Sequence, residues 1–366
     1  MKVLTVLGTR PELIRLALVI ARLDQFCDHV LVHTGQNFDP RLSDLFFSEL
    51  GIRAPDHQLA GRAASFGDRI GAMLAAVDRV LEGERPDAVL ILGDTDSGLS
   101  AMLARRRGIP VYHMEAGNRC HDDCSPEEVN RRIIDHSSTV LLPYTQRSRE
   151  NLLREGIPGE SIFVTGNPIH EVLMRYSGGI EGSDIHARLG LDAQGYFLVT
   201  MHRAETVDEQ GRLRSLVEAL AAVGAKYGQP VVCSLHPRSR DRMSQMGVRF
   251  SGTAVRYLEP LGLFDFVALE RRARCVLTDS GTVQEECAVQ RVPSVTLRDF
   301  TERPETIEAG ANMLVGVRAE AVLRGMEVVL SEPPAWDPPA GYLDAGVATK
   351  VVKIVLGGRG GAHRRP

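Results

Sequence analysis

The fold of this 366-residue chain is decided by the sequence at residues 275–286, CVLTDSGTVQEE. Residues 275–277 are typical of a buried strand, Ser280 and Gly281 of a tight turn, and residues 283–289 of the first turns of a helix. The first N–H groups of a helix have no partner within it, and the helix dipole makes that end positive. The pattern therefore predicts a site for a phosphate group where the strand ends.

A second segment of this kind lies near the start of the chain. The apolar residues 3–7 lead into residues 8–12, GTRPE. Glycine allows close approach of the backbone, proline suits the first position of a helix, and Arg10 can meet a phosphate. Arg10 fits a surface position in a strand-to-helix loop equally well. The two segments together suggest a nucleotide sugar held between two domains.

Between and around these segments, short apolar runs alternate with amphipathic stretches. The expected strands are residues 3–7, 29–33, 88–92, 111–114, 139–142, 161–164, 196–200, 231–234, 255–257, 275–278 and 294–297. The main expected helices are residues 13–23, 66–81, 95–107, 146–155 and 212–227. This alternation predicts parallel sheets with helices on both faces.

We therefore expect an α/β protein with two doubly wound, Rossmann-like domains that face a central cleft. The first domain is expected at residues 1–175 and carries the acidic residues described below. The second, which binds the phosphate groups, is expected at residues 176–356, and the linker between the domains is expected within residues 174–184, which contain Gly178 and Gly179. Residues 357–366 have no apolar side chains to bury beyond one alanine and are expected to be a disordered tail.

Composition excludes several classes of protein. The chain is 43% hydrophobic and 25% charged with a net charge of −4, and its basic and acidic residues are interspersed, which gives no basic field for nucleic acid or an anionic membrane. No apolar run approaches the ~18 residues that a membrane span needs, and the apolar start ends at Gly8, unlike a signal peptide. We expect a cytoplasmic protein.

The six cysteines support a reducing compartment. Cys233, Cys275 and Cys287 lie in apolar patterns and are expected to be reduced core thiols. Cys120 and Cys124 flank a histidine and two aspartates, but no second ligand pair has the spacing of a zinc site. We expect no metal.

Two acidic residues stand at the ends of neighbouring predicted strands. Asp94 follows the strand at 88–92, and Glu115 follows the strand at 111–114. Asp94 is equally suited to cap the next helix, whereas Glu115 ends a buried strand and has no such structural role. Because parallel strands end at one edge of the sheet, both carboxylates point to acid and base chemistry there.

Other polar residues occupy similar positions. Glu127 and Arg131 are four residues apart on one face of a predicted helix, which fits a surface ion pair or residues that line the site. His202 and His236 each follow a predicted strand of the second domain, a position that favours contact with a ligand over a structural role. Arg303 follows a later strand and can reach a phosphate.

Taken in order, these motifs resemble those of the bacterial non-hydrolysing UDP-N-acetylglucosamine 2-epimerases, a family with the two-domain GT-B fold. The shared motifs are GTRPE (8–12), GDT (93–95), EAG (115–117), PEE with NR (126–131), HR (202–203), DSG with QEE (279–286) and TERPE (301–305). Each motif is weak alone, but their ordered combination is specific.

The resemblance implies that UDP leaves C1 of the sugar to give a 2-acetamidoglucal and adds back after a proton returns to the opposite face of C2. The hydrogen on C2 is hardly acidic, because C2 bears an acetamido nitrogen and no adjacent carbonyl. Cleavage of the C1–O bond builds positive charge that makes this proton removable, while carboxylates move protons and arginines stabilise UDP. The resemblance implies no cofactor, a UDP-sugar substrate and a homodimer.

Matching positions carry roles to individual residues. The implied catalytic residues are Asp94, Glu115 and Glu127, with Arg131 and His202 as their ionic partners. The implied residues for binding the UDP-sugar are Arg10, Arg15, His236, Ser280, Gly281, Thr282, Glu286 and Arg303. A carboxylate can accept both ribose hydroxyl hydrogens, which is the role implied for Glu286. Which acid removes the proton and which returns it stays open.

Several positions depart from the family pattern. Arg15 stands where members often have lysine, Thr282 where a glycine is common, and Asn37 where histidine follows glutamine. These departures resemble the branch that acts on UDP-linked 2-acetamido-2,6-dideoxy hexoses or diacetamido uronic acids. In many members UDP-N-acetylglucosamine also activates from a second site that includes the Gln-His pair, so Asn37 leaves this activation open.

Three other classes of function remain in view. A GT-B glycosyltransferase would share the fold but needs an acceptor and has no use for Asp94, Glu115 and Glu127 together. A hydrolysing 2-epimerase would release free N-acetylmannosamine. A non-catalytic sensor of nucleotide sugars would leave the hydrogen on C2 unexchanged in deuterated water.

Overall fold

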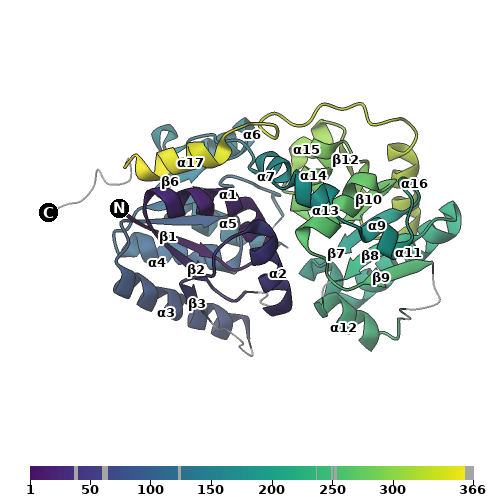
Figure 1. Ribbon diagram of the computed structural model, residues 1–366, viewed down its shortest axis with the longest axis horizontal. Coiled ribbons are helices and arrows are strands. Elements are labelled where there is room, and N and C mark those ends of the chain that lie inside the picture. The colour runs from purple at the N-terminus through teal and green to yellow at the C-terminus, as the bar shows by residue number, and fades with distance from the viewer. Residues whose placement is uncertain are drawn as a thin grey trace. The chain divides into compact units, whose positions relative to one another are not determined.

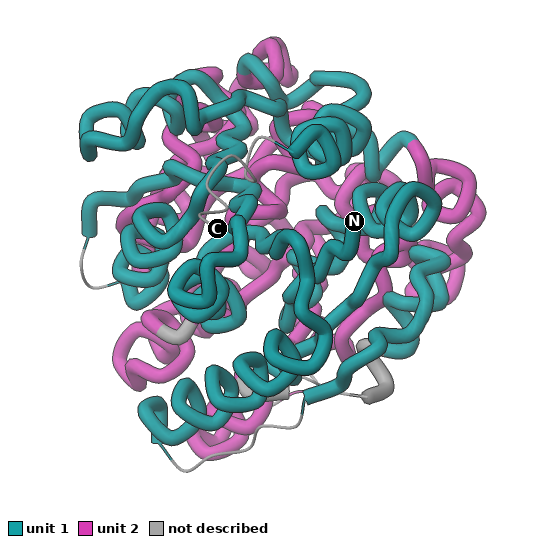
Figure 2. The backbone as a smooth tube through the Cα atoms, turned by 90° about the vertical axis from the view of Figure 1, so that its left-hand side faces the viewer, with its two compact units in different colours: residues 1–174, 340–366 teal, residues 175–339 magenta. Residues whose placement is uncertain are grey.

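The computed structural model of the protein describes residues 1–36, 40–59, 65–122, 125–235, 237–248, 250 and 254–358. The chain forms two compact units (Figure 2). Unit 1 contains residues 1–174 and 340–366, and unit 2 contains residues 175–339. Each unit contains one six-stranded parallel sheet. The predicted fold class, two doubly wound parallel-sheet domains, is confirmed.

The sheet of unit 1 has the strand order β3-β2-β1-β4-β5-β6. Its strands are β1 (Lys2–Leu7), β2 (Asp28–His33), β3 (His57–Gln58), β4 (Ala88–Leu92), β5 (Val111–Met114) and β6 (Val140–Leu142). Every residue of β4 and β5 is buried, which explains why these strands are nearly continuous apolar runs. Because β1, β4 and β5 are neighbours, the loops that follow them lie at one edge of the sheet.

Helices connect these strands on both sides of the sheet (Figure 1). They are α1 (Arg10–Phe26), α2 (Pro40–Leu50), α3 (Phe66–Glu84), the 3-10 turn η1 (Asp96–Leu99), α4 (Ser100–Arg106), α5 (Pro126–Ser137), α6 (Gln146–Arg154), the 3-10 turn η2 (Gly159–Ser161) and α7 (Ile169–Arg175). None of the helices in the described ranges is long and apolar enough to cross a membrane.

The last helix, α17 (Val347–Leu356), packs on α1 of unit 1 (Figure 1). Residues 340–356 were expected in the second domain, but they belong to the first unit. Apolar residues of α17 such as Val351 and Val355 are fully buried, and this packing determines where the segment lies. Residues 359–366 of the expected tail lie outside the described residues.

Unit 2 repeats the architecture with the strand order β12-β11-β10-β7-β8-β9. Its strands are β7 (Phe197–Met201), β8 (Val231–Leu235), β9 (Val255–Leu258), β10 (Cys275–Thr278), β11 (Ser294–Thr296) and β12 (Asn312–Leu314). Its helices are α8 (Ser177–Glu181), α9 (Ile185–Leu189), α10 (Ala204–Val207), α11 (Gln210–Tyr227), α12 (Pro237–Gln245), α13 (Leu263–Arg272), α14 (Gly281–Gln290), α15 (Pro304–Glu308) and α16 (Ala319–Val329). The pairs β10–β7 and β7–β8 place the ends of three strands side by side.

One predicted strand is wrong. Residues 161–164 form no strand: η2 ends at Ser161, and Ile162 makes only an isolated bridge to Leu141. The apolar Ile162 is buried beside β6, so its burial produced a strand-like pattern without a strand ladder.

Gly8 is expected to tolerate no side chain. A Cβ atom there would lie 2.2 Å from Thr34 Oγ1 and 2.3 Å from Ser97 Oγ, which are hydrogen-bonded to each other. We expect Gly8→Ala to lower the free energy of unfolding by about 1–3 kcal/mol through overpacking. Gly71→Ala in α3 is the matched control, since a Cβ there meets nothing within 4 Å, and it should be stabilising by about 0.5–1 kcal/mol. Equal urea midpoints for the two variants would contradict the packing argument.

Candidate functional site

In unit 1, Glu12 links the loops that follow β1 and β4. Its Oε2 atom accepts hydrogen bonds from the backbone N–H groups of Gly8 (3.0 Å) and Thr9 (2.8 Å) and from the Thr9 hydroxyl. Its Oε1 atom accepts from the Thr95 hydroxyl at 2.9 Å. Burial raises the pKa of Glu12 to about 7. The hydrogen bonds lower this pKa, but they offset the effect of burial only in part. The GTRPE and GDT motifs are thus held together by one buried acid.

Arg10 and Arg15 both extend from α1. Arg10 is half-buried at the first position of the helix, and its guanidinium lies 5.8 Å from the centre of the Phe46 ring. Arg15 is buried, and its Nη1 atom donates to Glu115 Oε2. Asn118 approaches the other oxygen of Glu115 at 3.4 Å. Glu115 is therefore held by a buried arginine on one oxygen and approached by an amide on the other.

Glu115 has an unusual backbone conformation. Its φ angle is +65°, in the left-handed region that residues other than glycine rarely adopt. Its N–H donates to the carbonyl of Leu142 on β6, so the sheet still holds its backbone. Such strained positions are frequent at functional sites.

Asp94 is held by Arg131 of α5. The Nε and Nη2 atoms of Arg131 lie 2.9 and 2.6 Å from Asp94 Oδ2, and Asn130 donates to the backbone carbonyl of Asp94 at 3.0 Å. The Arg131 side chain is 3% exposed and that of Asp94 is 18% exposed. The partly exposed carboxylate of Asp94 is therefore ion-paired with the buried guanidinium of Arg131.

Glu128, which follows Glu127, was missed by the sequence analysis. It is fully buried and accepts from Arg131 Nη1 at 2.8 Å and from the backbone N–H of Cys120 at 3.0 Å. Glu127 is half-buried in the first turn of α5 and accepts from the Ser125 hydroxyl at 3.0 Å. The spacing of three residues between Glu128 and Arg131 was the available signal.

A second buried network supports the same edge of the sheet. The ring nitrogens of His113 lie 2.8 Å from Asp135 Oδ1 and 2.9 Å from the carbonyl oxygen of Gly93. Asp135 also pairs with Arg119 at 2.8 Å and accepts from the N–H of Gly117. Burial alone would raise the pKa of Asp135, but His113 and Arg119 outweigh it and hold that pKa below its usual value. The network ties the loop of Asp94 to the loop of Glu115.

In unit 2, Asp279 joins the ends of β7 and β10. Its Oδ2 atom accepts from the N–H groups of His202 (2.7 Å) and Arg203 (2.9 Å), and its Oδ1 atom lies 3.1 Å from His202 Nδ1. Burial raises the pKa of Asp279, but the His202 ring and these N–H groups outweigh it and leave the pKa below its usual value. The His202 side chain is 39% exposed and oriented by a buried carboxylate.

The predicted strand, turn and helix form as expected at β10 and α14. Ser280 is the N-cap residue, its N–H donates to Thr278 Oγ1, and α14 begins at Gly281. A Cβ atom on Gly281 would lie 2.7 Å from Glu302 Oε1, so glycine is needed there. Ser280 and Thr282 are each 8% exposed and flank this glycine in the first turn.

Arg303 lies behind this turn. Its side chain is 3% exposed, and its Nε atom donates to Glu285, which is fully buried. Its backbone N–H donates to Thr301 Oγ1, whose hydroxyl donates to Gln284 of α14. The TERPE motif thus braces the start of α14 through two residues of the QEE motif.

Glu286 is 2% exposed in α14, next to the buried Glu270 of α13. His236 and Asn37 lie outside the described residues. Gln36 is described, and its Oε1 atom lies 3.4 Å from the N–H of Ser97. Within the described part of the chain, no group of three or more His, Cys, Asp or Glu side chains is arranged to hold a metal ion.

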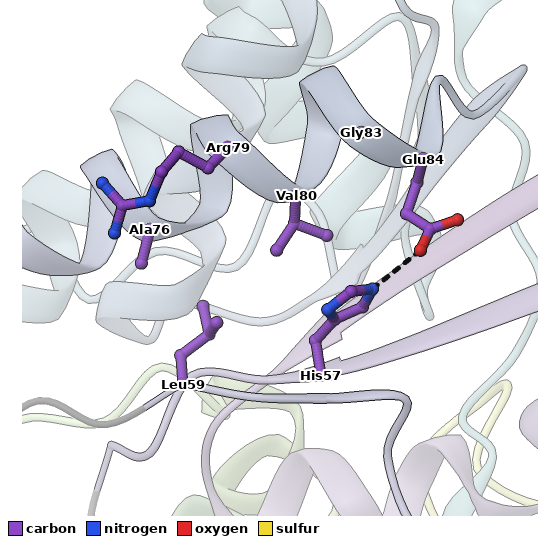
Figure 3. Close-up of a pocket in the computed structure, with 7 residues that line it drawn as sticks. All are labelled: His57, Leu59, Ala76, Arg79, Val80, Gly83 and Glu84. Carbon is purple, nitrogen blue, oxygen red and sulfur yellow. Dashed lines mark hydrogen bonds and ion pairs between the residues drawn. The ribbon is translucent and has the colours of Figure 1, made fainter.

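A cavity of about 240 Å³ lies elsewhere in unit 1 (Figure 3). It is lined by β3 and α3, where His57 Nε2 lies 2.8 Å from Glu84 Oε1, and by Leu59. The carboxylates at the ends of β4 and β5 are not among its lining residues. We therefore take the strand ends as the candidate site.

Two Rossmann-like units, one with ion-paired carboxylates at its strand ends and one with a turn suited to phosphate, define an enzyme of the GT-B class that acts on nucleotide sugars. The family model described as UDP-N-acetylglucosamine 2-epimerase matches residues 21–356. The chain belongs to this family, and the resemblance drawn from its motifs is confirmed.

Similar proteins agree with this assignment. The chain is 37% identical to the UDP-N-acetylglucosamine 2-epimerase of Methanocaldococcus jannaschii, over 98% of this chain and 100% of that protein. It is 36% identical to the UDP-2,3-diacetamido-2,3-dideoxy-D-glucuronate 2-epimerase of Pseudomonas aeruginosa, over 91% of this chain and 93% of that protein. A crystal structure of the M. jannaschii enzyme in complex with UDP-GlcNAc and UDP matches with a TM-score of 0.93, 37% identity and coverage of 98% of this chain and 100% of that chain.

Proposed function

We propose that this protein epimerises a UDP-N-acetylhexosamine at C2, with UDP-N-acetylglucosamine as substrate and UDP-N-acetylmannosamine as product. The observation that carries the proposal is the pair of carboxylates Asp94 and Glu115, which follow neighbouring strands and are each ion-paired with a buried arginine. Membership of the 2-epimerase family supports the reaction.

The carboxylates of unit 1 move the proton. A carboxylate removes the proton from C2, the C1–O electron pair leaves with UDP, and a C1–C2 double bond forms. Return of a proton to the opposite face and re-addition of UDP invert C2. Removal and return on opposite faces require proton-transfer groups in more than one position, which Asp94, Glu115 and Glu127 offer. Their charges also stabilise the positive charge that builds at C1.

We assign the binding of the UDP group to residues of unit 2. The first turn of α14, with Ser280, Gly281 and Thr282, offers backbone N–H groups to the pyrophosphate. Glu286 accepts the ribose hydroxyls. We assign further contacts with the UDP-sugar to Arg10, Arg15, His202 and His236, and the support of this binding turn to Arg303.

Arg303 is expected to affect UDP binding by bracing α14. Arg303→Ala removes the cation that holds the buried Glu285, and we expect UDP affinity to fall by about tenfold or more, the equivalent of one lost charge-assisted hydrogen bond. Isothermal titration calorimetry with UDP measures this. Arg291→Ala, at the exposed other end of the same helix, is the matched control and should bind UDP as the wild type does. Unchanged affinity in Arg303→Ala would remove Arg303 from the binding set.

A second substrate is favoured by two observations. The similarity to the Pseudomonas diacetamido-glucuronate epimerase covers most of the chain, and Thr282 replaces the glycine common in the family. Both fit an epimerase that acts on a modified UDP-N-acetylhexosamine.

Proton NMR in deuterated water tests these proposals. Formation of UDP-N-acetylmannosamine with deuterium at C2 from UDP-N-acetylglucosamine would establish the substrate and the proton transfer. Turnover of only the 6-deoxy or uronic acid analogues would establish the second candidate. Release of free N-acetylmannosamine would indicate a hydrolysing enzyme, and inertness towards every sugar would argue for a transferase or a sensor.

We further infer a homodimer in the cytoplasm. The implied family assembly supports the dimer, and light scattering of the purified protein tests it. The five described cysteines are free thiols, which supports a reducing compartment. A titration of the initial rate against the concentration of UDP-N-acetylglucosamine tests whether this sugar nucleotide activates the enzyme from a second site.

A further inference from the structure

Two carboxyl groups lie together in the interior of unit 2. Glu270 near the end of α13 is fully buried, and Glu286 of α14 is 2% exposed. The two side chains interact directly. Two buried carboxylates in contact cannot both be ionised at low cost, so the pair is expected to share one proton.

The hydrogen bonds around Glu270 indicate which oxygen carries the proton. Arg271 Nε donates to Gln290 Oε1 at 2.5 Å, and an arginine can only donate, so the amide nitrogen of Gln290 faces Glu270. That nitrogen donates to Glu270 Oε1. Glu270 Oε2 is buried, and no donor among the described residues lies within hydrogen-bond distance of it. A protonated Oε2 would supply the missing hydrogen bond itself.

The surrounding charges favour a neutral Glu270. Burial and then the Glu286 carboxylate raise the pKa of Glu270 well above its usual value, and Arg271 only partly offsets them. Cys287 and Cys275 are the other titratable groups nearby, and burial raises the pKa of both thiols, so both stay neutral at pH 7.

We infer that Glu270 is a positioning residue that stays protonated and donates its O–H to Glu286, which keeps Glu286 ionised and oriented to accept the ribose hydroxyls. This inference rests on the proposed role of Glu286 in binding UDP. Glu270 is fully buried and acts only through Glu286. Two hydrogen bonds in series, from Arg271 to Gln290 and from Gln290 to Glu270, fix the orientation of Glu270.

Two variants of Glu270 separate positioning from packing. Glu270→Gln keeps the shape, donates from its amide to Glu286 and still accepts from Gln290, so it should bind UDP within about twofold of the wild type. Glu270→Leu keeps an apolar side chain of similar bulk but donates nothing. We expect it to bind UDP about tenfold more weakly, the loss of one hydrogen bond to a charged group.

A UDP analogue without ribose hydroxyls distinguishes a loss of contacts made by Glu286 from a general loss of UDP affinity. For 2′,3′-dideoxy-UDP, the Glu270→Leu variant should bind as tightly as the wild type. Equal loss for both ligands, wild-type UDP affinity in Glu270→Leu, or a failure of Glu270→Gln to restore binding would each overturn the inference. If Glu286→Gln leaves UDP affinity unchanged, the proposed role of Glu286 fails, and this outcome is distinct from a failure at Glu270 alone.

Infrared spectroscopy tests the protonation state without a ligand. The difference spectrum of wild type minus Glu270→Gln at pH 7 should contain the carbonyl stretch of a protonated carboxylic acid. A difference spectrum with only carboxylate bands would overturn the inference. This measurement needs only the conservative variant, so it remains decisive if Glu270→Leu does not fold.

Discussion

Glu115→Gln is expected to lower the rate of C2 epimerisation by about a hundredfold or more, because it removes a carboxylate from the proposed proton-transfer groups. The amide keeps the shape of the side chain, and its single oxygen can still accept from Arg15. It carries no charge to stabilise C1 and cannot accept the C2 proton. UDP, which has no reacting sugar, should still bind.

The exchange of the C2 hydrogen for deuterium, followed by proton NMR, measures the effect. Glu150→Gln is the matched control, since its side chain is 59% exposed on α6 and its rate should be unchanged. Loss of the charge also leaves Arg15 buried beside a neutral partner, which lowers stability. UDP calorimetry on the variant therefore serves as the test of folding. A wild-type exchange rate in Glu115→Gln would remove Glu115 from the mechanism.

The fold was predictable where local pattern and burial coincide. Strands such as β4 and β10 are buried on both faces, so they are largely apolar runs, and a glycine or an acid follows each of them. The unit to which α17 belongs was not predictable. An apolar helix face can pack on the core of either unit, and only the tertiary structure shows that α17 packs on α1. The strand predicted at residues 161–164 was wrong for a similar reason. Ile162 is buried beside β6, which gives an apolar pattern like that of a strand, but it makes only an isolated bridge.

The residues of the candidate site could be proposed from their places at strand ends, but their hydrogen-bond partners could not. Spacing places Glu127 and Glu128 on the same helix and cannot determine which one faces inward. The structure buries Glu128 against the loop of Cys120, where it holds Arg131. Glu12 and Glu270 also escaped the sequence analysis, because an acid within a helix is usually exposed, and only the tertiary structure shows it buried.

The burial of Glu128 bears on the proposed role of Asp94 through Arg131, which pairs with both acids. It donates to Asp94 with Nε and Nη2 and to Glu128 with Nη1, so one buried cation serves two acids. Glu128 is fully buried, whereas Asp94 is partly exposed at the end of β4. Glu128 therefore helps to place the guanidinium, and the greater exposure of Asp94 is consistent with its proposed role as the acid that meets the substrate.

Asp94→Asn is accordingly expected to lower turnover by about a hundredfold or more, with UDP affinity close to that of the wild type. The backbone of Asp94 is held by Asn130 through its carbonyl group, which the substitution leaves in place. Arg131 keeps Glu128 as a charged partner, so the buried cation is not left uncompensated. The loss should therefore fall on catalysis and not on folding.

The matched control is Asp96→Asn, the same change two residues along the same loop. The Asp96 side chain is 13% exposed, but its partner Arg69 is 44% exposed. A pair with such an exposed cation contributes little, so the rate should stay within about twofold of the wild type. Comparable losses in both variants would show that the loop responds to any lost charge. A large loss in Asp94→Asn alone, with deuterium exchange at C2 reduced in parallel, would assign the proton transfer to the carboxylate that Arg131 holds.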